Sequence, residues 1–197
     1  MDKYVVTISR QFGSLGRSIA AELAERLNVE YLDRDIVEET ARRMGQHVSE
    51  ISNSEEVGVG AFLRRAFPLG AEASLRDSIF EVQKNIIRDF AKEQSGIVVG
   101  RCADYVLNDH PRKLSIYVYA PVEARLENCV KRLGMDEREA RRMINDVDQA
   151  REQYHKNYIP GYKNPFSGRD LCIDSSRFGV EGSAEILEHI VRERFYD

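Results

Sequence analysis

A glycine-containing turn near the start of the chain has the residue types and the position of a phosphate-binding site. The mostly β-branched or aromatic residues 4–8 predict a buried strand, and residues 19–27 predict an amphipathic helix. Gly13 and Gly16 lie in the segment between them. Such a turn leaves backbone N–H groups free at the positive end of the helix dipole, where they can bind phosphate. A strand–turn–helix corner with a purely structural role is the alternative.

This turn resembles a degenerate P-loop. Gly16, Arg17 and Ser18 stand where the motif has Gly, Lys and Ser or Thr. Gln11 occupies the position of the first glycine, and Arg17 replaces the lysine. An arginine keeps the positive charge but carries it on a planar fork rather than as a point charge.

A second candidate is Arg101, which follows the apolar strand predicted over residues 97–99. An arginine directly after a buried strand is costly unless its guanidinium meets an anion. A ligand phosphate or carboxylate would supply that anion. A structural ion pair with Asp104 or Asp33 would satisfy it equally well.

Short acidic side chains also follow predicted strands. Asp33 and Asp35 come after residues 30–32, and Asp174 comes after residues 171–173. Because ligands of parallel sheets bind at the carboxyl ends of the strands, each is a candidate for the site. Asp35 and Asp174 are better interpreted as caps of the helix or turn that follows them.

A basic cluster surrounds Gly134, between helices predicted over about 121–133 and 136–158. Its members are Arg125, Lys131, Arg132, Arg138, Arg141, Arg142 and Arg151. Acids interleave with them, which is typical of a solvated helical face. Beside a phosphate turn, the cluster also fits a hinged lid whose arginines neutralise a phosphoryl group in transfer. Asp148 and Arg151 are three residues apart and so share one face of their helix.

Strands and helices alternate along the chain and predict the scaffold that brings these candidates together. Strands are expected over 4–8, 30–32, 97–99, 114–119 and 171–173, with helices over about 33–44, 71–93 and 180–194 in addition to those above. This pattern predicts an α/β fold, a doubly wound five-stranded parallel sheet flanked by helices. Residues 45–70 are rich in glycine and fit either a flap or a plain connector.

Composition narrows the class of protein. The chain has 197 residues and a net charge of −4, which gives no reason to expect a nucleic-acid partner. Neither a signal peptide nor a membrane span is predicted, so we expect a cytoplasmic protein. Cys102, Cys129 and Cys172 are widely spaced. They favour reduced, buried thiols over a disulfide framework or a zinc site.

Over nearly its whole length the sequence is similar to the cytidylate-kinase-like branch of the P-loop nucleoside monophosphate kinases. The segments that carry this resemblance are residues 8–20, 31–36, 97–104, 148–154 and 170–176. The resemblance implies one P-loop kinase-like domain over 1–197, with an NMP-binding insert at about 35–94 and a helical lid at about 125–158. It also implies ATP- and Mg²⁺-dependent phosphorylation of CMP or dCMP.

The resemblance assigns residues to roles. The ATP phosphates would be held by Gly13, Ser14, Leu15, Gly16, Arg17 and Ser18, with the Ser18 hydroxyl as a Mg²⁺ ligand. The acceptor would be bound by Asp33, Arg34, Arg101, Asp104, Asp148 and Arg151. Catalytic charge neutralisation would come from Arg17, Arg132, Arg141 and Arg151.

Two positions depart from the family pattern. Cys102 stands where an acid is expected to help read the cytosine, and Asp104 is the acid that follows. Ile144 stands where the lid is expected to carry an arginine, and Arg141 is the substitute one turn earlier. These departures keep two further hypotheses open. One is a kinase of another small-molecule acceptor, and the other is a non-catalytic nucleotide-binding regulatory protein.

Overall fold

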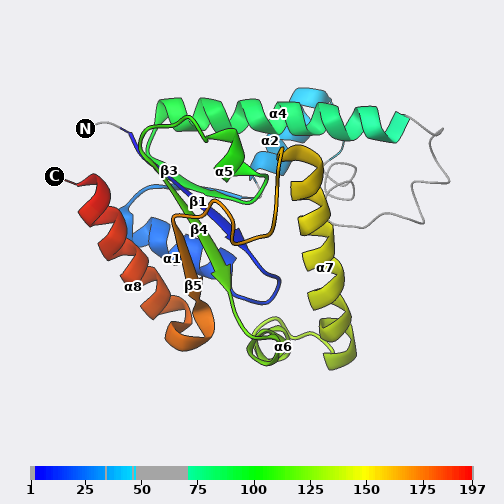
Figure 1. Ribbon diagram of the computed structural model, residues 1–197, viewed down its shortest axis with the longest axis vertical. Helices are drawn as coiled ribbons and strands as arrows, with labels where there is room; N and C mark the ends of the chain where they lie inside the picture. Colours follow the sequence, from blue (N-terminus) through cyan, green and yellow to red (C-terminus); the bar gives the residue numbers. More distant parts are fainter. Residues whose placement is uncertain (1–2, 34, 46, 48–70, 197) are drawn as a thin grey trace.

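Five parallel strands form the centre of the computed structural model, which describes residues 3–33, 35–45, 47 and 71–196 (Figure 1). The strands lie in the order β2-β3-β1-β4-β5. Their bounds are β1 (Val5–Arg10), β2 (Glu30–Leu32), β3 (Gly96–Val99), β4 (Lys113–Tyr119) and β5 (Leu171–Asp174). The predicted sheet is confirmed, and each strand agrees with its prediction to within two residues.

The register places the ends of the three inner strands at one edge of the sheet. Ile8 of β1 is level with Val99 of β3 and with Ile116 of β4. The loops after β1 and β3 therefore leave the sheet side by side, as a parallel arrangement requires. The turn at 11–15 and the loop at 100–102 are consequently neighbours.

Helices cover both faces of this sheet (Figure 1). Their bounds are α1 (Gly16–Leu27), α2 (Asp35–Met44), α4 (Ala71–Glu93), α5 (Ala103–Val106), α6 (Val122–Lys131), α7 (Glu137–Tyr158) and α8 (Ser175–Phe195). The short helix α5 was not predicted from the sequence. The closing helix begins five residues earlier than predicted, and it is interrupted at Gly179, whose φ is 66°.

Two apolar clusters hold the helices to the sheet. On one face Ile8 and Val99 pack with Leu23 of α1 and Leu187 of α8. On the other face Val5 and Val98 pack with residues of α2, α4 and α5, among them Phe80. The core strands are buried on both faces, which explains why they read as continuous apolar runs in the sequence.

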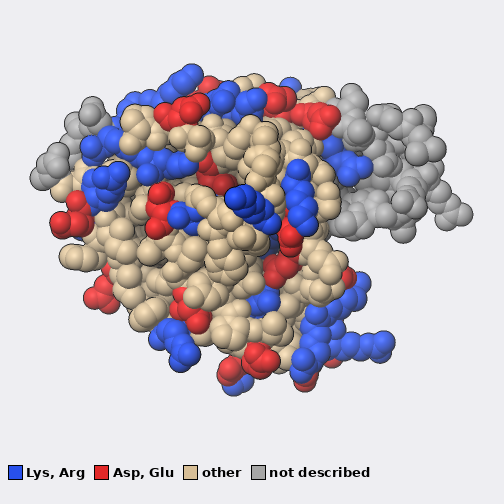
Figure 2. Space-filling view, viewed as in Figure 1, with Lys and Arg blue, Asp and Glu red and all other residues tan. Residues whose placement is uncertain are grey.

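Helices α6 and α7 form a hairpin that is attached to the turn after β1. Cys129, Ala140 and Ile144 make a small buried cluster between the two helices, and Phe12 of the turn packs against it. Asp136 caps α7 by accepting hydrogen bonds from the N–H groups of Arg138 (2.9 Å) and Glu139 (3.2 Å). Basic side chains gather where α7 begins, at the lower right of Figure 2.

Three other expectations have mixed outcomes. Cys102 and Cys129 are buried free thiols as predicted, but Cys172 is exposed, because it lies on the edge strand β5. The segment predicted as flap or connector, 45–70, lies almost entirely outside the described residues. Within the described ranges, no helix combines the length and apolar character that crossing a bilayer demands.

Candidate active site

Side chains of α6 and α8 hold the turn between β1 and α1 in place through hydrogen bonds to its carbonyl groups. Arg125 and Asn128 of α6 donate hydrogen bonds to the carbonyl oxygens of Phe12 (3.2 Å) and Gly13 (3.0 Å). The Ser175 hydroxyl, at the start of α8, donates to the carbonyl oxygen of Ser14 (2.7 Å). These bonds engage the carbonyl groups of Phe12, Gly13 and Ser14 and hold the turn in a fixed conformation.

The N–H groups at the start of α1 suit an anion. Leu15 caps the helix in a left-handed conformation with φ 61°, and Gly16 is the first helical residue. Among the described residues, no acceptor is hydrogen-bonded to the N–H groups of Leu15, Gly16, Arg17 or Ser18. Open N–H groups at a helix N-terminus carry partial positive charge. The geometry therefore supports the predicted phosphate turn.

The Gly13 position shows why a glycine is needed there. Its φ is +75°, and a Cβ would lie 2.9 Å from both the Arg125 carbonyl oxygen and the Cys129 Sγ. Ser14 is fully buried, and its hydroxyl donates to the carbonyl oxygen of Gln11 (2.9 Å). Ser14 thus supports the turn from inside, whereas Arg17 and Ser18 are exposed on its outer side.

A cavity of about 250 Å³ opens beside this turn, between the ends of β1 and β3 and the facing side of α7. Four arginines line it: Arg10, Arg101, Arg151 and Arg169. Aromatic side chains, among them Phe12, Tyr117 and Tyr162, form much of the remaining wall. This combination suits a ligand that is both anionic and flat.

The imidazole and phenol side chains that line the cavity are uncharged near pH 7. Burial lowers the pKa of His155, whose Nδ1 lies 2.7 Å from the carbonyl oxygen of Arg151. Burial raises the pKa of Tyr162 to about 12 and raises that of Tyr117 as well. Both phenols therefore remain donors, and the positive charge of the site comes from its arginines.

Arg101 lies at the cavity on a strained backbone. Gly100, Arg101 and Cys102 have successive φ values of 76°, 55° and 52°. Left-handed conformations cost about 1 kcal/mol or more for non-glycine residues, and they cluster at functional sites. Both acids proposed as structural partners of Arg101 form ion pairs with other arginines: Asp104 pairs with Arg169, and Asp33 pairs with Arg17.

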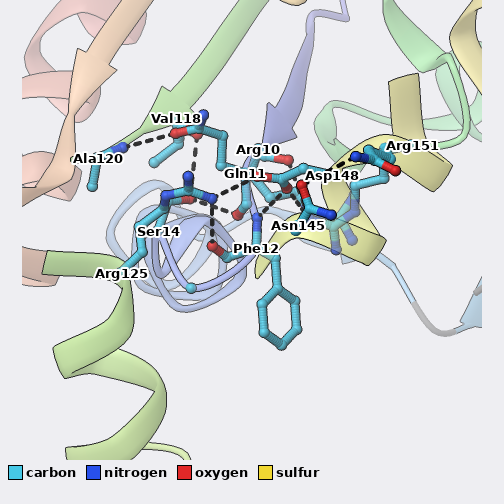
Figure 3. A network of polar contacts seen from close by, with 12 residues as sticks. Arg10, Gln11, Phe12, Ser14, Val118, Ala120, Arg125, Asn145, Asp148 and Arg151 are labelled. Carbon is cyan, nitrogen blue, oxygen red and sulfur yellow. Dashed lines mark hydrogen bonds and ion pairs between the residues drawn. The ribbon is translucent and has the colours of Figure 1, made fainter. Parts of the chain in front are cut away.

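Asp148 and Arg151 both line the cavity, but their side chains have different hydrogen-bond partners (Figure 3). The Asp148 carboxylate pairs with Arg125 Nη1 (2.5 Å) and accepts a hydrogen bond from the Phe12 N–H (2.7 Å). Arg151 Nη1 donates to the carbonyl oxygen of Arg10 (3.2 Å) and lies 4.0 Å from Asp148. Asp148 thus connects α7 to the turn and to α6, while the positively charged Arg151 side chain lines the cavity.

The other predicted site residues lie outside the cavity lining. Asp33 is 3% exposed and accepts from Arg17 Nε (2.5 Å) and from the Tyr31 hydroxyl (3.1 Å). Arg141 is exposed and pairs with Glu137 of its own helix (2.8 Å), and Arg132 is exposed at the end of α6. Arg34 lies outside the described residues. The catalytic and binding roles assigned to these residues stay predictions.

Of the two acids interpreted as caps, Asp174 is confirmed as a cap, whereas Asp35 lies just inside its helix. Asp174 is the N-cap of α8 and accepts from the Ser176 N–H (3.0 Å). Asp35 is the first residue of α2, where a negative charge favours the helix dipole.

Cys102 does not reach the cavity. Its side chain is fully buried in the apolar cluster between the sheet and α5, and burial together with nearby Asp104 raises the pKa of its thiol. Cys102, which stands where the family pattern has an acid, is therefore a residue of the apolar core.

Replacing Cys102 with aspartate is expected to cost stability rather than to create a base-reading group. The new carboxylate would be buried beside Asp104, and an unpaired buried polar group costs about 1–3 kcal/mol, more when charged. We expect Cys102→Asp to lower the melting temperature by several degrees, and Cys102→Ala to lower it less. A Cys102→Asp variant as stable as wild type, with a new preference among pyrimidine monophosphates, would contradict this.

Sequence reasoning missed three arginines of the site. Arg10 ends a buried strand, so the argument applied to Arg101 would have found it. Arg125 was seen as part of the basic cluster but not as the partner of Asp148. Arg169 precedes β5, and its side chain is only 2% exposed. No local signal marks Arg169, because its partner Asp104 is brought to it by the packing of distant segments.

The comparisons with known proteins agree with this arrangement. A family model described as the cytidylate kinase-like family matches residues 5–177. A cytidylate kinase of Methanopyrus kandleri is 28% identical over 193 residues, covering 93% of this chain and 91% of the relative. A cytidylate kinase of Methanocaldococcus jannaschii is 25% identical over 190 residues, covering 95% and 97%.

Solved structures share the fold. An uncharacterized protein from Eubacterium ventriosum is 24% identical with a TM-score of 0.74, covering 98% of this chain and 100% of that one. A shikimate kinase from Acinetobacter baumannii is 14% identical with a TM-score of 0.55, covering 99% and 96%. The family match extends over most of the chain and includes the glycine turn, Arg101 and the Asp148–Arg151 segment, so the chain belongs to the cytidylate kinase-like family.

Proposed function

We propose that this protein transfers the γ-phosphoryl group of ATP to the phosphate of a nucleoside monophosphate, with CMP or dCMP as the acceptor. The observation that carries the proposal is an arginine-lined cavity directly beside a glycine turn with open N–H groups. Membership of the family supports a nucleotide kinase. The relatives that are cytidylate kinases support the choice of acceptor.

In this proposal the two halves of the site hold the two substrates. The N–H groups at the start of α1 bind the ATP phosphates, and Arg101 and Arg151 bind the acceptor phosphate across the cavity. Phosphoryl transfer needs little more than in-line positioning and neutralisation of charge. Arg132 and Arg141, at the exposed end of the α6–α7 hairpin, would join the site only if the hairpin moves as a lid.

The residues present fit Mg²⁺ carried by ATP. Within the described part of the chain, no group of three or more His, Cys, Asp or Glu side chains could hold a metal ion. The exposed Ser18 hydroxyl, in the first turn of α1, is the ligand that the turn offers. This agrees with the ordinary binding of Mg²⁺, which uses few protein ligands together with substrate phosphates and water. When bound, the ion would help to neutralise the phosphoryl oxygens.

One observation favours a second acceptor class. The carboxylate of Asp104, which the resemblance assigns to the acceptor, is engaged by Arg169, and that of Asp148 is engaged by Arg125. Cytosine recognition needs an acceptor for its exocyclic amine. Both oxygens of Asp148 are engaged, and Asp104, whose Oδ1 has no hydrogen-bond partner among the described residues, does not line the cavity. A kinase that phosphorylates another small phosphorylated compound is therefore the second candidate.

A substrate panel tests the proposal. ADP formation is measured with MgATP and each of CMP, dCMP, UMP and AMP, with ATP alone as the blank. We expect the highest kcat/KM with CMP or dCMP, and a higher melting temperature when ATP and that acceptor are present together. Turnover of a different phosphorylated acceptor would select the second candidate. ATP binding without any turnover would contradict both and favour a regulatory nucleotide-binding protein.

A further inference from the structure

Arg10 occupies a space that two glycines leave open for it. A Cβ on Gly16 would lie 2.6 Å from the Arg10 Cβ, and a Cβ on Gly100 would lie 2.4 Å from Arg10 Nη1. The stem of Arg10 therefore passes beneath the first residue of α1, and its guanidinium arrives beside the loop that follows β3. Gly16, which the sequence marks as a phosphate-turn glycine, thus also makes room for this side chain.

The Arg10 guanidinium is buried, and its charge is only loosely compensated. The side chain is 10% exposed, and its acidic neighbour among the described residues is Asp33, at 3.9 Å from Nη2. Asp33 is more closely bound to Arg17 Nε, at 2.5 Å. In the described part of the chain the Arg10 side chain donates no hydrogen bond. A buried cation in this state is stabilised when an anion comes within reach of its fork.

The surroundings of Arg10 are positively charged. Burial, together with the charges of Arg151, Arg101 and Arg17, lowers the pKa of Arg10 to about 9 against the opposing effect of Asp33. Arg10 is still protonated at neutral pH. It lines the same cavity as Arg101 and Arg151, and its carbonyl oxygen accepts the hydrogen bond from Arg151 (Figure 3). The cavity thus places Arg10 between the start of α1 and the predicted acceptor arginine.

Arg17 is placed differently, although it occupies the lysine position of the motif. Its side chain is 52% exposed, and it is engaged by Asp33 on the outer side of the helix. Arg17 does not line the cavity. The lysine of a P-loop contacts the β- and γ-phosphates, which demands a cation on the inner side of the turn.

We propose that Arg10, reaching in from the end of β1, is the cation that contacts the transferred phosphoryl group, in the role that a P-loop gives to its lysine. The inference rests on the proposed function. In the transfer, an acceptor phosphate oxygen forms a bond to the γ-phosphorus while the bond from that phosphorus to the β–γ bridging oxygen breaks. The electron pair of the broken bond leaves with ADP. Arg10 binds the phosphoryl oxygens throughout and exchanges no proton.

The test uses variants that keep the stem of Arg10 but change its charge. Arg10→Met preserves packing beneath Gly16 and removes the cation, and Arg10→Lys restores a charge without the fork. Arg177→Met is the matched control, because the Arg177 side chain is 77% exposed on α8 and lies outside the cavity. Arg17→Met is compared with Arg10→Met, because Arg17 occupies the lysine position of the motif. Two readouts are taken for each folded variant: kcat with MgATP and the best acceptor of wild type, and the Kd for inorganic tripolyphosphate by calorimetry.

We expect Arg10→Met to lower kcat about a hundredfold, the size typical for loss of one preorganised charge-stabilising donor. Tripolyphosphate should bind about tenfold more weakly. Arg10→Lys should recover part of both losses, and the control Arg177→Met should stay within a few fold of wild type. Arg17→Met should lose less of both than Arg10→Met does. If Arg10→Met does not fold, Arg10→Gln, which is also neutral but keeps a polar end group, takes its place in both measurements.

The proposal is overturned if a folded neutral variant keeps kcat and tripolyphosphate affinity within threefold of wild type while Arg17→Met loses both. A purely structural Arg10 would change the melting temperature alone. Failure of the proposed function looks different, because wild type would then phosphorylate none of the monophosphates. The tripolyphosphate measurement still decides the role of Arg10 as an anion ligand in that case.

Discussion

Removing the Arg125 charge, in an Arg125→Met variant, is expected to lower the free energy of unfolding by about 3 kcal/mol, the lower end of the range for breaking a buried ion pair from one side. The Arg125 side chain is 6% exposed, and it connects the Asp148 carboxylate to the Phe12 carbonyl oxygen. Its loss leaves Asp148 with the Phe12 N–H alone among these contacts. Urea unfolding followed by circular dichroism measures the change.

Lys131→Met provides the matched control on the same helix. Lys131 is 71% exposed and pairs with Glu127 one turn away, so its loss should cost under about 1 kcal/mol. In the double variant Arg125→Met with Asp148→Asn, the cost should be smaller than the sum of the two single costs, because the variants remove one shared interaction. Equal costs for Arg125 and Lys131 would show that the buried pair does not hold the hairpin.

The Arg125 variant should also weaken ATP binding, even though Arg125 does not line the cavity. Arg125 and Asn128 fix the carbonyl groups of Phe12 and Gly13, and the open N–H groups at the start of α1 depend on that turn for their direction. Asp148 connects the same turn to α7, which carries Arg151. The network in Figure 3 therefore couples the geometry of the two predicted substrate sites.

The scaffold was predictable from the sequence because its signals are local. The apolar runs at β1, β3 and β4 and the regular spacing along α4 depend on neighbours in the chain, and these elements agree with prediction. The short helix α5 follows three residues with positive φ, two of them not glycine. Sequence periodicity carries no information about such a strained backbone.

The partners of the charged residues were much less predictable. Arg101 was expected to meet a ligand, Asp104 or Asp33, and the fold pairs those two acids with Arg169 and Arg17, which the sequence did not indicate. Which acid an arginine reaches depends on the packing of segments far apart in sequence. The burial of Arg10 beneath Gly16 has the same origin, since the motif marks the glycine but not the side chain that fills the space beside it.

Replacing Arg101 with alanine is expected to raise the KM of the acceptor and to lower its kcat/KM about a hundredfold. That factor corresponds to about 3 kcal/mol, the upper range for a charge-assisted hydrogen bond. The dissociation constant of ATP should hardly change, because the proposal assigns the ATP phosphates to the N–H groups at the start of α1 and Arg101, after β3, to the acceptor phosphate. Initial-rate kinetics with varied acceptor and calorimetry with ATP measure the two quantities separately.

Backbone strain does not confound the Arg101 variant. Arginine and alanine both carry a Cβ, so the cost of φ 55° is nearly the same in wild type and in Arg101→Ala. Arg177→Ala is the control for loss of an exposed arginine, since its side chain is 77% exposed and lies on α8. Arg101→Lys keeps the charge and should recover part of the loss, because a lysine binds phosphate without the two-pronged geometry. Should Arg101→Ala instead lower the melting temperature and leave acceptor kinetics intact, Arg101 would be a structural cation, and the acceptor phosphate would be bound elsewhere.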